Sequence, residues 1–401
     1  MDRLKSLYIC YLSLEDPLAH SQVVAYLEGL AARGHTIHLL TFEPELSDER
    51  KRALAASLGA RGITWHSLRY HKRPSLPATI YDVLVGAAVA ARLVRRHRLA
   101  AVHARSHVPA AMGLIVGRLT GCRLIFDLRG LMAEEYADAG RWKAGSLAFR
   151  ITKRVELAAI RATDAMVVLT KAVRNYLFAA MPPPPLEVIP CCADLEAIEA
   201  LREEREATRR ELNAGDRPVL VYVGKFTGWY MEREMVDFFA AAREVLPGLL
   251  FVIVTQADRE PALAALRRRG IGPDDFRITS AAPGEIGRYL SAADAGISFI
   301  RPCFSKISSS PTKIGEYLGA GLPVISGTGI GDVDELLSSD GAGVLVPEFS
   351  DAAYRAAAGR IGELIADERT RLRCRELARR ELSLDEVGIP RYDRLYRQLA
   401  R

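Results

Sequence analysis

The sequence predicts an α/β protein with two doubly wound domains that face each other across a cleft. Short apolar runs alternate with amphipathic helical patterns along the chain, which is typical of parallel sheets covered by helices. A length of 401 residues is more than one hydrophobic core normally organises. A charged segment, residues 197–217, separates one series of apolar runs from a second series. Ligands of such folds bind at the carboxyl ends of the strands, where we expect the functional site.

The first domain is placed at residues 1–195. A helix over residues 21–33 is expected to end at Gly34, because glycine commonly follows the last helical residue. Apolar runs of strand length predict the strands, which are expected at residues 6–12, 36–42, 63–70, 100–106, 123–129, 165–170 and 186–190.

The second domain is placed at residues 215–385, with the boundary near residues 191–215. Its strands are expected at residues 218–224, 249–255, 276–281, 295–300, 323–326 and 343–347. The helical tail, residues 352–401, is longer than the second sheet needs. We therefore expect its last part, residues 386–401, to form a helix that crosses back onto the first domain.

Composition narrows the class of protein. A hydrophobic fraction of 49% and a charged fraction of 26% are typical of a soluble globular protein. The net charge of +6 suits an anionic ligand, nucleic acid or a membrane surface, without choosing among them. The six cysteines form no Cys-x-x-Cys motif and no zinc-ligand spacing, so we expect reduced thiols in a cytoplasmic protein and no metal site.

Neither a signal peptide nor a membrane span is expected. The first strand starts almost at the first residue, which leaves no room for a secretory leader. The most apolar long stretch, residues 76–94, is interrupted by Asp82 and Arg92, so it falls short of the roughly 20 apolar residues that span a bilayer.

Residues 308–326, SSSPTKIGEYLGAGLPVIS, predict a helix whose N-terminus binds phosphate. Ser310 is a suitable N-cap and Pro311 a suitable first helical residue. Lys313 falls in the first turn, where the helix dipole disfavours a cation unless an anion binds there. Glu316 shares a helix face with Thr312 and Lys313. This pattern suits a nucleotide-sugar site, with diphosphate at the tip and hydroxyl groups at Glu316. The alternative is an ordinary capped helix with Lys313 and Glu316 as a surface ion pair.

A second phosphate contact is predicted where the strand at residues 218–224 ends. Gly224 lets the backbone approach a ligand closely, and Lys225 can meet phosphate as a point charge. The alternative is a plain turn with a solvated lysine. Residues 327–332, GTGIGD, have the wrong glycine spacing for a dinucleotide fingerprint and are interpreted as a turn near the site.

Polar residues also end two strands of the first domain. Asp127 could accept a proton or bind a hydroxyl group, or it could simply cap a helix or pair with Arg129. His103, Arg105 and His107 alternate along the preceding strand end and so share one side of it. We interpret His103 as a structural histidine.

Basic clusters at residues 69–74 and 92–98 flank an apolar helix. Such a helix can lie on an anionic membrane, although a solvated face is the more common reason for this pattern. Aromatic residues are sparse here, so a single-stranded nucleic acid partner is not expected.

Together these motifs resemble the retaining GT-B glycosyltransferases of family 4, over nearly the whole chain. SSPTKIGEYLGAGLPVI is similar to the family's donor-site helix, with Glu316 as the glutamate that contacts the ribose. YVGKF resembles the strand end that carries a basic residue, here Lys225, to the diphosphate. VIPCCADLE resembles the interdomain motif, with Asp194 at its aspartate. The resemblance implies a GT-B fold of two Rossmann-like domains, with the acceptor bound by the first and the nucleotide-sugar by the second.

The sequence departs from the family pattern at four places. Ser308 stands where the family has a first glutamate that meets the transferred sugar. Tyr230 stands near the place of a second basic residue, whose charge Lys306 or Lys313 could supply. The glycine pair of the first loop is replaced around residues 19–22, and Asp127 replaces the reaction-centre histidine. Several of these departures occur together in a recognisable bacterial branch of the family, so we do not interpret them as loss of activity.

The resemblance implies transfer of a sugar from a nucleotide-sugar to a glycan or lipid-linked acceptor, with retention and without a metal or other cofactor. Expected catalytic residues are Asp127, Lys225, Arg105 and Arg129. Expected donor-binding residues are Ser310, Pro311, Thr312, Lys313, Glu316, Gly224 and Lys306. We expect a cytoplasmic enzyme, peripheral on the inner face of the cell membrane, in polysaccharide or glycolipid synthesis. A nucleotide-sugar epimerase, or a non-catalytic protein that binds sugar or nucleic acid, remains as an alternative.

Overall fold

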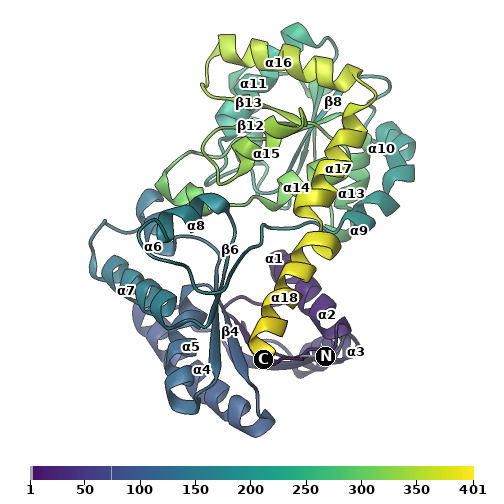
Figure 1. Ribbon diagram of the computed structural model, residues 1–401. Coiled ribbons are helices and arrows are strands. Elements are labelled where there is room, and N and C mark those ends of the chain that lie inside the picture. Colours follow the sequence, from purple (N-terminus) through teal and green to yellow (C-terminus); the bar gives the residue numbers. More distant parts are fainter. Residues whose placement is uncertain (1–2, 74) are drawn as a thin grey trace. The chain divides into compact units, whose positions relative to one another are not determined.

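A computed structural model describes residues 3–73 and 75–401 and divides the chain into two compact units (Figure 1). Unit 1 comprises Met1–Pro190, Phe304–Ser309 and Gly388–Arg401, and unit 2 comprises Cys191–Cys303 and Ser310–Val387. The chain therefore passes between the units at more points than a single boundary near residues 191–215 would require.

Unit 1 contains a seven-stranded parallel sheet in the order β3-β2-β1-β4-β5-β6-β7. The central strands β4, β5 and β6 are almost fully buried, which explains why they appear in the sequence as continuous apolar runs. The strands are β1 (Lys5–Cys10), β2 (Thr36–Glu43), β3 (Ile63–Arg69), β4 (Ala101–Arg105), β5 (Arg123–Leu128), β6 (Ala165–Val168) and β7 (Leu186–Val188).

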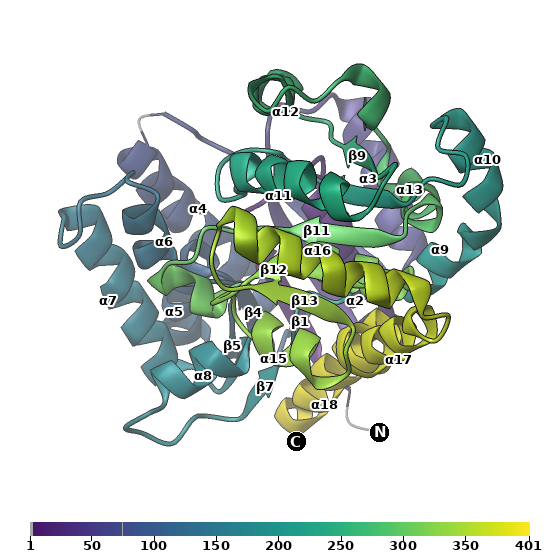
Figure 2. The same ribbon diagram turned by 90° about the horizontal axis from the view of Figure 1, so that it is seen from above.

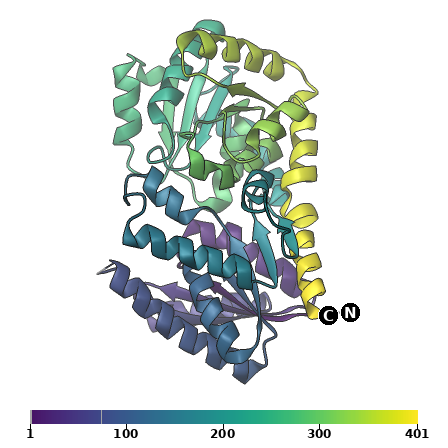
Figure 3. The ribbon, with the colours of Figure 1, turned by 60° about the vertical axis from the view of Figure 1, so that its left-hand side comes forward.

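Helices cover both faces of this sheet. Figure 3 shows long helices on one face, where α4, α5 and α7 build a single hydrophobic core with the strands. On α2, a Cβ added at Gly29 would lie 2.3 Å from Ile389 of α18, so these two helices pack without a gap. The helical segments are α1 (Pro17–Ala19), η1 (His20–Val24), α2 (Ala25–Ala32), α3 (Asp48–Ala60), α4 (Ser75–His97), α5 (His107–Thr120), α6 (Met132–Asp138), α7 (Leu147–Ala162), α8 (Lys171–Leu177), η5 (Phe304–Ser308) and α18 (Ile389–Ala400).

Helix α4 is long and apolar enough to cross a membrane by length and composition, with a mean hydropathy of 1.4 in its most apolar window. Its inner face, which includes Ala87, Ala90 and Val94, is buried in the core of unit 1. The length and composition of α4 therefore differ from the expectation that residues 76–94 fall short of a span, while its inner face packs as in the core helix of a folded domain.

Unit 2 contains a six-stranded parallel sheet in the order β10-β9-β8-β11-β12-β13. Two hydrophobic clusters lie on its two faces: α11, α12 and α16 contribute to one, and α13, α14, α15 and α17 to the other (Figure 2). The strands are β8 (Val219–Val223), β9 (Leu250–Val254), β10 (Phe276–Thr279), β11 (Ala295–Ser298), β12 (Val324–Gly327) and β13 (Gly343–Val346). The helical segments are α9 (Leu195–Ala200), η2 (Arg202–Glu204), α10 (Arg205–Glu211), α11 (Glu232–Val245), α12 (Glu260–Arg268), η3 (Pro273–Asp275), η4 (Pro283–Glu285), α13 (Ile286–Ala292), α14 (Thr312–Gly319), α15 (Val333–Ser339), α16 (Asp351–Ala366), α17 (Thr370–Leu382) and η6 (Leu384–Gly388).

The charged segment at residues 197–217 is part of unit 2, although its composition suggested a connection between domains. It folds into η2 and α10 because Arg205 and Arg209 bind Asp294 and backbone carbonyls at the end of α13. Leu212 then enters one of the hydrophobic clusters of the unit.

His38, His66 and His97 form a cluster in unit 1. Because of this cluster, we expect the protein to lose stability in mild acid. His38 Nδ1 lies 3.0 Å from His66 Nε2, and the ring centres of His38 and His97 are 4.5 Å apart. Burial, followed by the charges of His97 and His66, lowers the pKa of His38 to about 4. Between pH 6.5 and 4 the unfolded chain therefore binds a proton that the folded chain does not, so stability falls as the pH falls through that window.

For His38 alone, the free energy of unfolding should fall by roughly 2–3 kcal/mol, and this loss is complete once the pH is below the pKa of His38 in the folded protein. Urea unfolding across this pH range should show a shallower pH dependence for His38→Gln than for the parent. An unchanged dependence in a folded His38→Gln variant would contradict this assignment.

Candidate functional site

The carboxyl end of β8 and the N-terminus of α14 meet in unit 2. Gly224 follows β8 with a φ of +118°, which favours glycine. A Cβ added at Gly224 would lie 3.5 Å from Lys313 Nζ in the first turn of α14. The backbone at the strand end therefore runs directly beside the lysine ammonium. The structure brings together the two segments that the sequence predicted as phosphate contacts.

Two tyrosines enclose Lys313, and neither was predicted from the sequence. The ammonium lies 3.4 Å from the ring centre of Tyr230 and 4.4 Å from that of Tyr222, and it donates a hydrogen bond to Tyr222 Oη at 3.2 Å. Cation–π contacts of a desolvated lysine contribute about 2 kcal/mol. Tyr230 stands near the place of a second basic residue in the family pattern, and here it covers Lys313 instead.

Lys313 is only 6% exposed, so its charge is poorly solvated. Burial lowers the pKa of Lys313 well below its usual value, and the negative charge of Glu316 only partly offsets this. Burial also raises the pKa of Glu316, with Lys313 acting in the opposite direction. An anion bound beside Lys313 would restore the ammonium form. The pair is therefore not the surface ion pair considered as an alternative above.

The N-terminus of α14 differs by one residue from the expected arrangement. Pro311 is the N-cap, and the helix begins at Thr312. Ser310, the predicted cap, instead accepts a hydrogen bond from the Cys191 N–H at 3.0 Å. Among the described residues no side chain caps α14, so the first-turn N–H groups at Thr312 and Lys313 remain available to an anion.

Lys225 differs from Lys313 in its surroundings. Its side chain is exposed, while its backbone carbonyl accepts a hydrogen bond from Tyr222 Oη. Tyr222 therefore contacts both lysines of this region. The exposed Lys225 can move toward a ligand, whereas Lys313 is fixed.

Lys306 and Ser308 belong to unit 1 rather than to the site in unit 2. Lys306 Nζ forms an ion pair with Glu135 Oε1 at 3.0 Å. Ser308 Oγ accepts a hydrogen bond from the Leu131 N–H at 3.1 Å. These contacts of both side chains lie within unit 1, and the role of Lys306 in donor binding stays a prediction. In the sequence, the segment Phe304–Ser309 stands between two stretches of unit 2. It nevertheless makes these contacts inside unit 1.

Asp127 is fully buried in unit 1, beneath α18. Its Oδ2 accepts hydrogen bonds from Tyr392 at 3.0 Å and from Tyr8 at 3.5 Å, and Arg129 lies 3.5 Å from Oδ1. Burial alone would raise the pKa of Asp127, but Arg129, then His103, hold it well below its usual range. These contacts fasten the C-terminal helix to β5. They do not give Asp127 the exposed position of a group that touches a substrate.

Arg105 and Arg129 were predicted at the same strand ends. Arg129 donates a hydrogen bond to Gln22 Oε1 at 3.3 Å in addition to its contact with Asp127. Arg105 Nε is buried without a hydrogen-bond partner in the described structure. The next residue, Ser106, has a φ of +72°, a strained value for a residue with a side chain, and such strain often marks functional segments. Arg105 is thus the better placed of the two to contact a ligand.

The two histidines near this edge have structural partners. His103 Nδ1 lies 2.8 Å from Tyr396 Oη of α18, and His107 Nε2 lies 2.8 Å from Glu156 Oε2 of α7. Burial lowers the pKa of His103. His103 thus ties α18 to β4, whereas His107 begins α5 instead of continuing the strand and ties that helix to α7.

Family models cover most of the chain in two parts. Residues 19–197 match the model described as Glycosyltransferase Family 4, and residues 217–367 match the model described as Glycosyl transferases group 1. No curated protein matches the chain in sequence.

Solved structures share the fold over the full length of the chain. A glycosyltransferase from Rickettsia africae is 14% identical with a TM-score of 0.75, and the match covers 100% of both chains. Sucrose-phosphate synthase from Thermosynechococcus elongatus is 17% identical, with a TM-score of 0.71 over 99% of each chain. Anabaena HepE, solved in complex with UDP and glucose, is 14% identical with a TM-score of 0.70 over 98% of this chain and 99% of that one. The two consecutive family models, together with this fold, identify the protein as a glycosyltransferase of the GT-B type, similar to glycosyltransferase family 4.

Proposed function

We propose that this glycosyltransferase moves a sugar from a nucleotide-sugar donor to a glycan or lipid-linked acceptor, with retention of the anomeric configuration. The observation that carries the proposal is the buried Lys313, which lies beside the uncapped N-terminus of α14 and one helical turn from Glu316. UDP and glucose are bound by the similar Anabaena structure, which supports a nucleotide-sugar as the donor class. Retention rests on the resemblance to family 4.

The donor diphosphate would bind at Lys313 and the N–H groups of the first turn of α14. During transfer, the bond from the anomeric carbon to the diphosphate oxygen breaks, a bond to the acceptor oxygen forms, and the acceptor hydroxyl loses its proton. Negative charge grows on the departing diphosphate, where a fixed ammonium and helix N–H groups stabilise the transition state. Lys225 adds a mobile charge, and Glu316 accepts hydrogen bonds from the ribose hydroxyl groups. Arg105 and Arg129 add positive potential in unit 1.

Glu316→Gln tests the donor assignment. Loss of a charge-assisted hydrogen bond should weaken nucleotide-sugar binding by roughly 1.5–3 kcal/mol, about 10- to 150-fold. Calorimetric titration with nucleoside diphosphates and their sugars would measure it. Glu376→Gln, on the exposed side of α17, is the matched control and should bind as the parent does. Equal affinities in the two variants would remove Glu316 from the site.

We also infer that transfer needs no divalent metal, because an ammonium and helix N–H groups neutralise the leaving group. Activity should survive dialysis against a chelator. Complete loss, with recovery on addition of magnesium or manganese, would contradict this account of the charge.

A cytoplasmic enzyme that works on lipid-linked acceptors must reach the membrane, and the exposed face of α4 suits that task. Leu76, Ile80 and Leu84 follow at four-residue steps, and with Tyr81 they are between 38% and 59% exposed. The same helix ends in the exposed Arg92, Arg95 and Arg96. Apolar residues would enter the lipid boundary while arginines meet anionic headgroups.

Sedimentation with anionic vesicles should therefore depend on α4. Leu84→Asn should weaken vesicle binding about tenfold, because an exposed leucine loses about 1.5 kcal/mol of burial in the membrane boundary. The comparable exposed leucine of unit 2, in Leu372→Asn, should leave binding unchanged. Charge reversal at Arg92 and Arg96 should remove the preference for anionic over neutral vesicles. Identical binding by Leu84→Asn and Leu372→Asn would place the docking surface elsewhere.

A further inference from the structure

A pocket of unit 2 lies at the opposite end of α14 from Lys313. It has a volume of about 240 Å³ and is lined by the α9–α10 segment, α13, α17 and Ala320, the C-cap of α14. A helix rises 1.5 Å per residue, so Lys313 and Ala320 are separated by roughly 10 Å along the axis. The pocket is therefore distinct from the proposed donor site.

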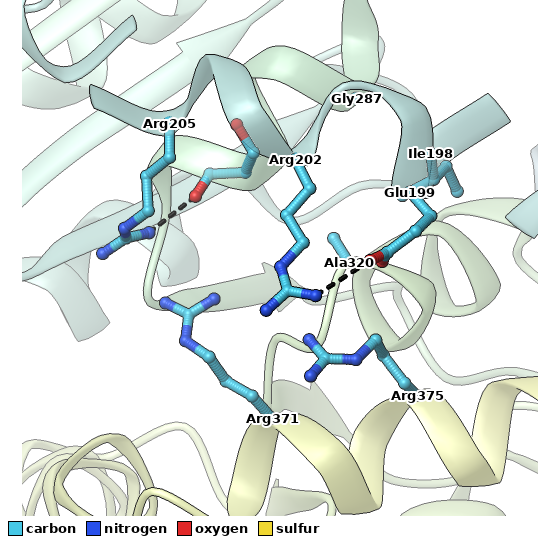
Figure 4. A pocket seen from close by; sticks show the side chains of 9 residues that line it. Ile198, Glu199, Arg202, Arg205, Gly287, Ala320, Arg371 and Arg375 are labelled. Atoms are coloured by element: carbon cyan, nitrogen blue, oxygen red, sulfur yellow. Dashed lines mark hydrogen bonds and ion pairs between the residues drawn. The ribbon is translucent and has the colours of Figure 1, made fainter. Parts of the chain in front are cut away.

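Four arginines converge on this space (Figure 4). Arg202 and Arg205 reach it from η2 and α10, and Arg371 and Arg375 reach it from α17, so that cations stand on two opposite walls. One carboxylate of the lining, Glu199, lies 2.9 Å from Arg202. The remaining walls offer no further negative side chain among the described residues.

A single carboxylate behind the pocket is shared by several guanidinium groups. Asp294 Oδ1 lies 2.7 Å from Arg205 and 2.9 Å from Arg371, while Oδ2 lies 3.3 Å from Arg209. One negative charge is therefore divided among three positive ones. Burial lowers the pKa of Arg371, and repulsion from Arg205 and Arg375 lowers it further, against the opposing effect of Asp294.

Arg375 is the member of the group without a partner in the described part of the chain. It is half-buried and makes no hydrogen bond or ion pair there. Its guanidinium lies beside Gly321, where an added Cβ would be 2.7 Å from Arg375 Nη1. A guanidinium that has no acceptor among the described residues can bind one that comes from outside the chain.

We propose that this arginine pocket binds the phosphate group of a small phosphate ester. Guanidinium groups match the oxygens of a phosphate in paired hydrogen bonds; Arg375 can supply one such fork, and Arg371, whose Nη2 is bound to Ala293 and Asp294, adds positive charge. The volume is below the roughly 300–1,000 Å³ of sites for drug-sized ligands, so it suits a phosphorylated sugar or the headgroup of a phospholipid. The bound phosphate joins α17 to the α9–α10 segment and so stabilises unit 2.

Arg375→Gln is the decisive variant, because it removes no contact that the fold uses. Arg379→Gln on the same helix is its control, since Arg379 is exposed and its ion pair within the described residues is with Glu386. Calorimetric titrations with glucose 6-phosphate and with inorganic pyrophosphate cover the soluble ligands. Vesicles of phosphatidylcholine, with and without phosphatidylglycerol, cover the lipid source, with proteins that also carry Leu84→Asn and charge reversal at Arg92 and Arg96, so that α4 does not carry the binding. Circular dichroism confirms that each variant is folded.

The parent and Arg379→Gln should bind at least one of these phosphate probes with the same affinity, and Arg375→Gln should bind it about tenfold more weakly. If glucose 6-phosphate binds and the vesicles do not, the ligand of the pocket is a soluble metabolite. If the vesicles bind and the soluble probes do not, the ligand is a phospholipid headgroup. Absence of binding by the parent to every probe, or equal binding by Arg375→Gln, overturns the proposal. The donor assignment is tested separately by Glu316→Gln, so the two can fail independently.

Discussion

Replacement of Lys313 by methionine is expected to abolish sugar transfer while leaving the protein at least as stable as the parent. Methionine has a similar length and no charge, and it fills an apolar space without the cost of burying an ammonium. The aromatic rings of Tyr222 and Tyr230, which now contact the ammonium, can pack against the thioether. Residues that bind a ligand often lower the stability of the protein when the ligand is absent.

Affinity for a nucleoside diphosphate should fall about 100-fold in Lys313→Met, whereas affinity for the corresponding nucleoside should change little. The ammonium contributes through the diphosphate, and a charged hydrogen bond accounts for up to about 3 kcal/mol. Lys225→Met gives the comparison, since its exposed side chain predicts a loss of only about fivefold, as for other solvated ion pairs. Equal losses for diphosphate and nucleoside would show that Lys313 supports the fold of the site instead.

Proton uptake gives an independent measurement of the same group. The pKa of Lys313 is lowered by burial in the free protein, and a bound anion favours the charged form. Diphosphate binding to the parent should therefore take up protons in the pH range between the pKa of Lys313 in the free protein and its higher pKa in the complex, and this uptake should vanish in Lys313→Met. Calorimetry in two buffers of different ionisation enthalpy measures this quantity. A parent that binds without proton uptake over the whole range would contradict the assignment.

The fold could be predicted from sequence because its strands are locally encoded. Residues 249–255 form a continuous apolar run, and β9 (Leu250–Val254) is buried on both faces of the sheet, as such a run requires. The same argument holds for the buried strands β6, β8 and β11 but not for the partly exposed β3 and β10, and the predicted fold class is confirmed by the two parallel sheets. Residues of the predicted phosphate site that are close in sequence to strand or helix ends, such as Gly224 and Lys313, also lie together.

Contacts between distant parts of the chain could not be predicted. Tyr392 donates a hydrogen bond to Asp127, although the two residues are 265 positions apart in the sequence. The Ser310 hydroxyl, which the local sequence predicted to cap a helix, accepts a hydrogen bond from the Cys191 N–H instead. The local sequence does not predict that Phe304–Ser309 belongs to unit 1 either, because a six-residue segment of mixed polar and apolar residues shows no pattern that specifies which unit it packs against. Each of these outcomes depends on tertiary partners, which override local preference.

Asp127→Asn is expected to destabilise unit 1 strongly, by about 3–5 kcal/mol, because it leaves the buried Arg129 without its carboxylate. The low folded pKa of Asp127 means that its contribution is fully present above the unfolded carboxyl pKa and is lost only as the pH falls toward the folded value. The full destabilisation by Asp127→Asn should therefore be measured at neutral pH. Tyr392→Phe, which removes one hydrogen bond to the same carboxylate, should cost less, roughly 1.5–3 kcal/mol.

Kinetics then decide between a holding role and a catalytic one. If Asp127 fastens α18, Asp127→Asn should unfold at lower urea concentration, its amides in α18 should exchange faster, and turnover per folded molecule should stay within about threefold of the parent. Asp393→Asn is the control on the same helix; it loses the contact with His35 at 2.8 Å and should loosen α18 less, because Asp393 is partly solvated. A fall in turnover at saturating donor, with the unfolding midpoint unchanged, would instead return Asp127 to the reaction centre.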